Sequence, residues 1–352
     1  MRIATYNVEW FNSLFGRADK LYRKARKSGR PGVTTTDQAD ALGYVFATVD
    51  ADLTFIVEAP NTGHGRSTVR ALENFASHYG LRQSRARIGF VNGTQQELAV
   101  LFDPKKVACR HDPRGEKSNG DGSIRAPRFD GRFRLDTDVD GQPDIHGFSK
   151  PPLELAVTWR PTGSDFRMIG VHTKSKAPHG ARSKDEKTRI AIDNRRKQLA
   201  QSVWLRRRIE EHLDAGDPLV VLGDLNDGPG LDAYEKLFGR SSVEVVIGNP
   251  DRPDRMLVEP HARIELDPRH GWSISTARFY NAGLRRYVNA LLDYVMLSPD
   301  LVARTRPEWR IWHPFDDPDC FDNRAMQHAL LTASDHFPVS VDLDFRGWEA
   351  RT

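Results

Sequence analysis

Residues 219–227 read LVVLGDLND: four apolar residues, a glycine, and then two carboxylates and an amide within the next four positions. An unbroken apolar run bounded by turn residues is typical of a buried strand. The polar residues Asp224, Asn226 and Asp227 precede Gly-Pro-Gly at 228–230, and this composition favours a turn. The stretch therefore predicts a central strand whose end presents polar side chains. An ordinary polar turn without a further role is the alternative.

The rest of the chain alternates short apolar strands with helices. Apolar residues at helical spacing predict helices over 37–49, 69–79 and 188–213. Strands are predicted at 2–8, 52–57, 98–102, 153–159, 166–172, 219–222, 243–247, 291–297 and 337–345. This mixture predicts an α/β or α+β fold. Residues 103–150, rich in Gly, Pro, Asp and Arg, are expected to form an irregular excursion with one or two hairpins. No repeat or linker divides the chain, so a single domain over 1–352 is expected.

The composition is that of a folded protein, since 38% of the 352 residues are hydrophobic and 28% are charged. No apolar run approaches the roughly 18 residues of a membrane span, and the first residues lack the layout of a signal peptide. A cytoplasmic location without membrane contact is expected. Cys109 and Cys320 are far apart and support neither a disulfide framework nor a thiolate metal site. The net charge of +4 is mildly basic, and no protein partner is implied.

Polar residues follow several of the predicted strands directly, as they do at 219–227. They are Asn7, Glu9, Glu58, His172, Asp224, Asn226, Asp335 and His336. Each has an ordinary explanation when taken alone, as a solvated loop acid, a capping residue or a hydrogen-bonded histidine. Asp293 is different because it is flanked by Leu291, Leu292, Tyr294 and Val295, and a buried charge must be paired. A histidine such as His336 would be its most useful partner.

Taken together, these residues suit phosphoryl-transfer chemistry. The oxygen ligands of Glu58, Asn7 and Asp335 suit a hard cation, Mg²⁺ or Mn²⁺, better than zinc. An imidazole held by a carboxylate is a proton acceptor or a charged stabiliser of an oxyanion. Asp224 could orient a water, and Asn226 could donate to a phosphate oxygen. Hydrolysis of a phosphoester needs mainly such alignment and charge neutralisation.

The order of the motifs resembles the endonuclease/exonuclease/phosphatase superfamily of exonuclease III-like and deoxyribonuclease I-like enzymes. The motifs are TYNVE at 5–9, VE at 57–58, VHT at 171–173, LGDLND at 222–227, LDY at 292–294 and SDHFPV at 334–339. The resemblance spans almost the whole chain. It implies a four-layer α/β/β/α sandwich, in which two mixed sheets pack face to face with helices outside and a metal site lies at one end.

The resemblance also implies a role for each matching residue in the in-line attack of water on a phosphodiester. Glu58 is implied as the main metal ligand, with Asn7 and Asp335 beside it and Glu9 in support. The implied catalytic groups are Asp224 for the water, Asn226 for a phosphate oxygen, and His172 and His336, the latter oriented by Asp293. Val57 and Glu9 depart from the family, which often has Gln and Asp there. Abasic-site endonucleases usually have Tyr at the position of His172, and inositol phosphatases usually have Trp at that of Leu222, so both branches fit poorly.

Basic residues near these motifs suggest a nucleic-acid substrate, DNA or RNA. The stretch 17–30 has many Lys and Arg, including Arg23, against one acid, and Arg285 precedes the Asp293 strand among aromatic residues. Lys174 and Lys176 follow His172 and could neutralise phosphates. Solvated surface is the alternative for all of these, and it is the preferred interpretation of Arg206, Arg207 and Arg208. The alternative functions are hydrolysis of a small phosphorylated metabolite and nucleic-acid binding without catalysis.

Overall fold

Two β-sheets carry the fold of the computed structural model, which describes residues 1–92, 96–120, 125–137, 140–178, 180–228, 239–265, 273–281 and 284–348. The six-stranded sheet has the order β14 (Glu308–Ile311), β15 (Val339–Asp342), β1 (Arg2–Asn7), β2 (Leu53–Ala59), β4 (Glu97–Phe102) and β3 (Arg85–Ile88). The five-stranded sheet has the order β13 (Asp293–Leu297), β10 (Leu219–Asp224), β9 (Ser164–His172), β8 (Leu153–Trp159) and β5 (Val107–His111). Both sheets are mixed, because β1 with β2 and β9 with β10 are parallel pairs among antiparallel ones.

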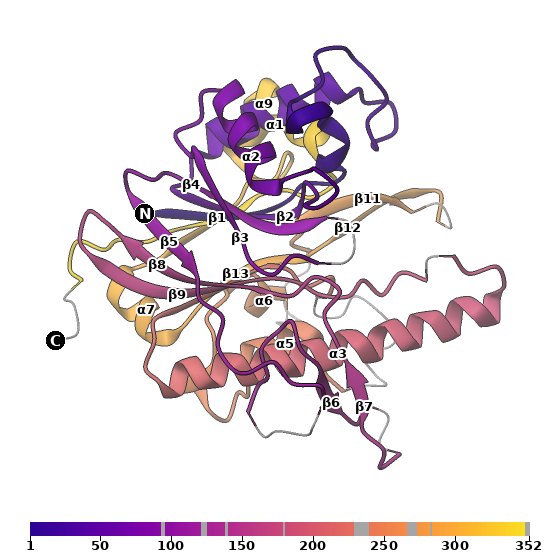
Figure 1. Cartoon of the computed structure of the whole chain (residues 1–352), viewed down its shortest axis with the longest axis vertical. Coiled ribbons are helices and arrows are strands. Elements are labelled where there is room, and N and C mark those ends of the chain that lie inside the picture. Colours follow the sequence, from indigo (N-terminus) through magenta and orange to yellow (C-terminus); the bar gives the residue numbers. More distant parts are fainter. Residues whose placement is uncertain are drawn as a thin grey trace.

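Helices cover the outer face of each sheet (Figure 1). The six-stranded sheet is covered by α1 (Thr35–Val49), α2 (Thr68–His78), α8 (Pro318–Asp322) and α9 (Arg324–Ala333), and the five-stranded sheet by α3 (Lys184–Asp214), α5 (Ser242–Ile247) and α6 (Pro260–Glu265). The helix α7 (Pro299–Thr305) follows β13. Three apolar cores separate the layers, and the middle one joins the two sheets through residues such as Phe55, Val157 and Leu222. The chain therefore forms the predicted four-layer sandwich.

Local sequence explains where the covering helices begin. Thr34 caps α1 by accepting a hydrogen bond from Asp37 N, and the Asp37 side chain bonds back to the Thr34 backbone. Ser183 caps α3 in the same way through Glu186 N, so that α3 begins four residues earlier than predicted. Within the described part of the chain, none of the helices combines the length and the apolar character that crossing a membrane requires.

The structure corrects the prediction of a strand at 243–247, where α5 forms instead. Ser241 and Glu244 make a capping box that satisfies the first backbone N–H groups of a helix, and this outweighs the β-branched composition. The short strand β3 was not predicted, because it has only four residues and is largely exposed. In the excursion 103–150, β5 belongs to the main sheet, whereas β6 (Phe133–Leu135) and β7 (Asp144–His146) form an expected hairpin.

The solvated interpretation of the three consecutive arginines is also wrong for Arg206 and Arg208. Arg206 donates to the backbone oxygens of Val246, Ile247 and Arg255. The side chain of Arg208 is buried and its guanidinium donates to the backbone oxygens of Arg114, Ala126 and Pro127. These contacts hold the excursion against α3. A sequence of three cations on a helix contains no sign of this role, since the acceptors are backbone atoms roughly 80 to 90 positions away.

Candidate active site

The strand ends of both sheets meet at one cleft of about 1110 Å³. In the six-stranded sheet Asn7 pairs with Val57, next to Glu58, and in the five-stranded sheet Asp224 lies between His172 and Asp293. The predicted site residues that line the cleft are Asn7, Glu9, Glu58, His172, Lys174, Lys176, Asp224, Asn226, Asp335 and His336. Residues separated by more than 300 positions thus share one cavity.

Unusual backbone conformations aim two of these side chains. Glu58 has a φ of 62° at an irregularity in the pairing of β2 with β4, which places its carboxylate in the cleft. Gly223 has a φ of 131°, and a Cβ there would lie 2.0 Å from the backbone oxygen of Val171. Only glycine fits at this position, directly before Asp224.

Asp293 and His336 form the buried pair that the sequence predicts. His336 Nδ1 donates to Asp293 Oδ2 over 2.7 Å, and Thr276 Oγ1 donates to the same oxygen over 2.9 Å. Burial opposes a charge on the imidazole, but the Asp293 carboxylate outweighs it and raises the pKa of His336 well above its usual value. The ring is therefore held as a cation that faces the cleft.

Asp224 is the most connected carboxylate of the site. Its Oδ2 accepts from Asn7 Nδ2 over 2.9 Å, a contact that joins the two sheets, and its Oδ1 accepts from Asn226 N over 2.7 Å. His172 Nε2 lies 3.6 Å from Oδ2. Burial, reinforced by the charge of Asp293, raises the pKa of Asp224 to about 7. Such a carboxyl is suited to accept a proton near neutral pH.

Two site residues, Lys150 and Gln96, were missed by sequence reasoning. Lys150 Nζ donates to Gln96 Oε1 over 3.0 Å and to His172 Nδ1 over 3.3 Å, and Gln96 Nε2 donates to Glu58 Oε2 over 2.6 Å. Since an ammonium only donates, His172 Nδ1 accepts, and the ring proton lies on Nε2 toward Asp224. Burial lowers the pKa of both Lys150 and His172. Both missed residues lie in loops without a pattern.

The acids at the mouth of the cleft have the chemistry of a cation site. Burial raises the pKa of Glu58 and of Glu9, the latter to about 7, and the charge of Asp335 adds to both shifts. Asn7 Oδ1 is buried without a hydrogen-bond partner. Mutually repelling carboxylates beside an unpartnered amide oxygen fit a hard divalent cation.

A second set of possible ligands, Asp224, Asp293 and His336, places one atom of each residue within 4.8 Å of the others. Asp293 Oδ2 already accepts hydrogen bonds from His336 and Thr276, and the His336 ring carries a positive charge. Hydrogen bonds therefore explain why these three side chains lie close together. The oxygen atoms of Glu58, Asp335 and Asn7 fit a cation better.

Comparison with known proteins shows the family of the chain. The model of the endonuclease/exonuclease/phosphatase family matches residues 4–336. The chain belongs to this family. It is accordingly a hydrolase that acts on phosphoester bonds and depends on a divalent metal. No curated protein sequence matches the chain.

Solved structures of low sequence identity are similar to the chain over nearly its whole length. One is an endonuclease/exonuclease/phosphatase family protein from Bacteroides thetaiotaomicron (14% identity, 97% of each chain covered, TM-score 0.49). Another is D. rerio TDP2 complexed with a single-strand DNA product (13% identity, 97% of this chain and 98% of that chain covered, TM-score 0.49). A third is the human nocturnin catalytic domain with bound sulfate (13% identity, 97% and 94% covered, TM-score 0.45).

The four predicted substrate-binding residues divide into two groups, of which one lines the cleft and the other lies outside its lining. Lys174 and Lys176 line the cleft, although Lys176 Nζ also donates to the buried Asp227 over 2.7 Å. Arg23 and Arg285 are exposed and lie outside the cleft lining, so their contact with substrate stays a prediction. From the basic stretch 17–30, the residue that reaches the site is Arg30, which pairs with Glu9.

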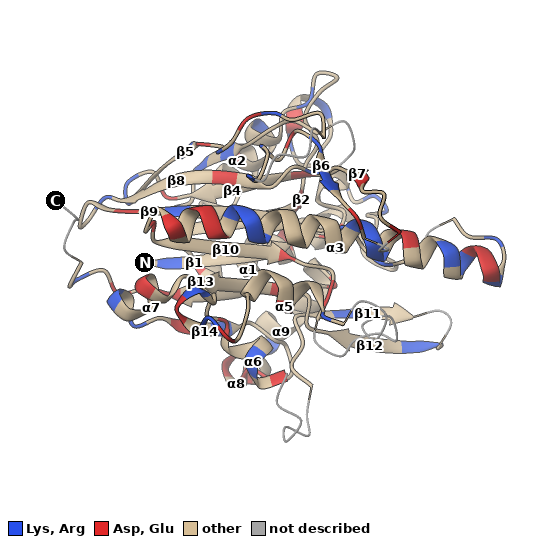
Figure 2. Cartoon of the chain, turned by 90° about the horizontal axis from the view of Figure 1, so that it is seen from below, with Lys and Arg blue, Asp and Glu red and all other residues tan. Residues whose placement is uncertain are grey.

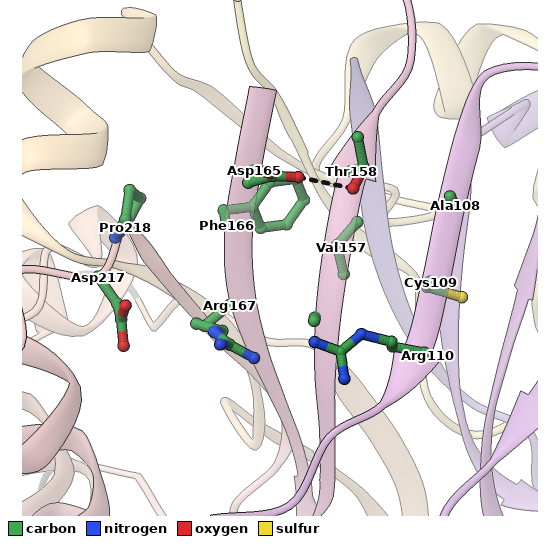
Figure 3. Close-up of a pocket in the computed structure, with 11 residues that line it drawn as sticks. Ala108, Cys109, Arg110, Val157, Thr158, Asp165, Phe166, Arg167, Asp217 and Pro218 are labelled. Atoms are coloured by element: carbon green, nitrogen blue, oxygen red, sulfur yellow. Dashed lines mark hydrogen bonds between the residues drawn. The ribbon is translucent and has the colours of Figure 1, made fainter. Parts of the chain in front are cut away.

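A second hollow, of about 470 Å³, lies at the opposite end of the five-stranded sheet (Figure 3). It is lined by the first residues of β9, whereas His172 is the last. Most of its charged groups already have partners, because Asp112 binds both Arg110 and Arg167, Asp217 pairs with Arg114, and Asp165 accepts from Thr158 Oγ1 over 2.6 Å. The strand ends with the predicted site residues lie in the other cleft.

Proposed function

We propose that the protein is a Mg²⁺- or Mn²⁺-dependent phosphodiesterase that cleaves nucleic acid, DNA or RNA, by in-line attack of water. The distribution of charge in the cleft supports this proposal. The acids Glu9, Glu58 and Asp335 lie close enough for their charges to interact, and every other charged residue of the described lining apart from Asp224 and the two histidines is a lysine. A cation site in a cleft with several lysines suits a substrate with several phosphates.

Glu58, Asp335 and Asn7 Oδ1 would hold the metal, with Glu9 in support. The ion would supply Lewis-acid stabilisation of charge on the phosphate. Both carboxylate oxygens of Glu9 already have partners, because Arg30 pairs with Oε2 and Trp10 Nε1 donates to Oε1 over 2.8 Å, so Glu9 would support the site without holding the metal directly.

The chain's own residues supply the remaining chemistry. Asp224 is buried, which favours its protonated form, and it therefore orients the attacking water and accepts its proton. Its Oδ1 is held by Asn226 N, and its Oδ2 lies near His172 Nε2. The cationic ring of His336, positioned by Asp293, stabilises the charge that develops on the phosphate. Asn226 Nδ2 donates to Thr173 O over 3.1 Å, and this amide would also donate to a phosphate oxygen. His172 Nε2, which lies 3.6 Å from Asp224 Oδ2, would donate to a second phosphate oxygen, and Lys150 adds a positive charge behind His172.

The test is a cleavage assay with Mg²⁺ or Mn²⁺ on plasmid DNA, single-stranded DNA, RNA and bis-p-nitrophenyl phosphate. Glu58→Gln and His336→Ala remove the proposed metal ligand and the charged ring. Asp165→Asn, in the distant hollow, is the matched control. Nucleic-acid cleavage that is lost in both site variants and kept in the control supports the proposal. Turnover of the small diester alone would favour a phosphorylated metabolite, and binding without turnover would favour a non-catalytic protein.

A further inference from the structure

Two segments project beyond the sandwich on the same side, as Figures 1 and 2 show. One is the first part of α3, whose 31 residues extend about 46 Å and whose first buried side chain is Asn194. The other is the two-stranded ribbon of β11 (Ala277–Asn281) and β12 (Arg286–Ala290). We call them the helix arm and the hairpin arm. Residues of both arms line the cleft, so its walls continue beyond the proposed catalytic groups.

The helix arm presents a cationic face to the cleft. Lys184, Lys187, Thr188 and Ala191 line it, and their spacing of three, four and seven residues puts them on one side of the helix. Neither lysine ammonium has an ion-pair or hydrogen-bond partner in the part of the chain that the structure describes. The acids of this turn, Asp185 and Glu186, are absent from the described lining.

The hairpin arm presents an apolar face to the same cleft. Phe279 and Val288 are directly opposite each other across the ribbon, and both line the cleft together with Leu284. Leu284 is 57% exposed. Phe279 and Val288 are half-buried, and a two-stranded ribbon gains little stability by itself, so the apolar face that it turns to the cleft is suited to contact a ligand.

We propose that the two arms hold one single strand of nucleic acid as it leaves the catalytic groups. Its phosphates lie along Lys184 and Lys187, and its bases lie against Phe279 and Val288. The faces of the bases are available in a single strand, whereas in a duplex they are covered by their neighbours in the stack. A cationic wall opposite an apolar wall therefore fits a single strand better than a duplex. This inference rests on the proposed function and specifies its substrate class.

Binding without cleavage tests the inference separately from catalysis. Fluorescence anisotropy in EDTA compares fluorescein-labelled 12-nucleotide single strands of DNA and RNA with the 12-base-pair DNA duplex. The variant Lys184→Ala/Lys187→Ala removes two charges from the cleft face. Its control, Arg182→Ala/Arg189→Ala, removes two exposed charges from the same arm outside the cleft lining. Phe279→Ala tests the apolar wall, with circular dichroism to check folding.

The lysine variant should reduce the slope of log K against log salt by about 1.4, or affinity by about 25-fold at 0.1 M salt, while the control binds like the wild type. Phe279→Ala should weaken single-strand binding about 5- to 150-fold. Equal binding by the lysine variant and its control, or a duplex bound as tightly as the single strand, would overturn the inference. Failure of the wild-type protein to hydrolyse any phosphodiester would instead contradict the proposed function.

Discussion

Replacing Asp293 with Asn removes one charge from the site while keeping its shape. Asp293 Oδ2 accepts hydrogen bonds from His336 Nδ1 and Thr276 Oγ1, whereas Oδ1 is buried without a partner. The oxygen of an asparagine can therefore accept both hydrogen bonds, and its NH₂ takes the place of the unpartnered oxygen. The ring of His336 keeps its position and loses the carboxylate that supports its positive charge.

A hydrogen bond to a charged group contributes about 1.5–3 kcal/mol. If this amount is lost from the transition state, kcat should fall about 10- to 150-fold at a tenfold change per 1.36 kcal/mol. KM should change little, because Asp293 does not line the cleft as far as the structure describes it. The prediction depends on the 2.7 Å hydrogen bond between His336 Nδ1 and Asp293 Oδ2.

The assay is steady-state hydrolysis of bis-p-nitrophenyl phosphate in Mn²⁺, with Asp165→Asn as the matched control. A kcat within threefold of the wild-type value in Asp293→Asn, with the variant folded, would refute the reasoning that His336 acts as a cation held by Asp293.

Three further predictions concern the ion pairs of Asp227, the buried His212 and the proposed metal site. Arg195→Met removes a buried cationic partner of Asp227, which then keeps Lys176 and the backbone N–H of Ser242. Urea unfolding should show a loss of about 3–5 kcal/mol, and a loss below 1 kcal/mol would contradict this. Burial lowers the pKa of His212 from 6.5 to about 4, so the unfolded chain binds a proton that the folded chain does not, and the free energy of unfolding should fall by about 3 kcal/mol as the pH drops from 6.5 to 4. The stability of His212→Gln should depend less on pH over this window, and a pH profile equal to that of the wild type would disprove the assignment. Mn²⁺ at 100 times its Kd should stabilise the protein by about 2.7 kcal/mol in thermal unfolding, and Glu58→Gln should lose this effect; a shift that persists would place the ion elsewhere.

Several features were predictable because they depend on neighbours in the sequence. The apolar runs of β8 and β10 form strands because their residues must leave water, whatever the sheet order. The contact between Asp293 and His336 was predictable for a related reason, since a carboxylate inside an apolar strand has to find a positive partner. The strand at 243–247 failed because the capping box around Ser241 decided the local structure.

The sequence by itself determined most strands of the two large sheets, the polar residues at their ends and the order of motifs that marks the family. Only the tertiary structure decided which of those ends share a cleft, that Lys150 and Gln96 join them, and that Arg208 is buried. Strand formation follows from local sterics and apolar burial, which a short window of sequence contains. The meeting of these strand ends in one cleft depends on sheet order and register, and these are set by strand pairings between residues hundreds of positions apart, such as Thr5 with Val339.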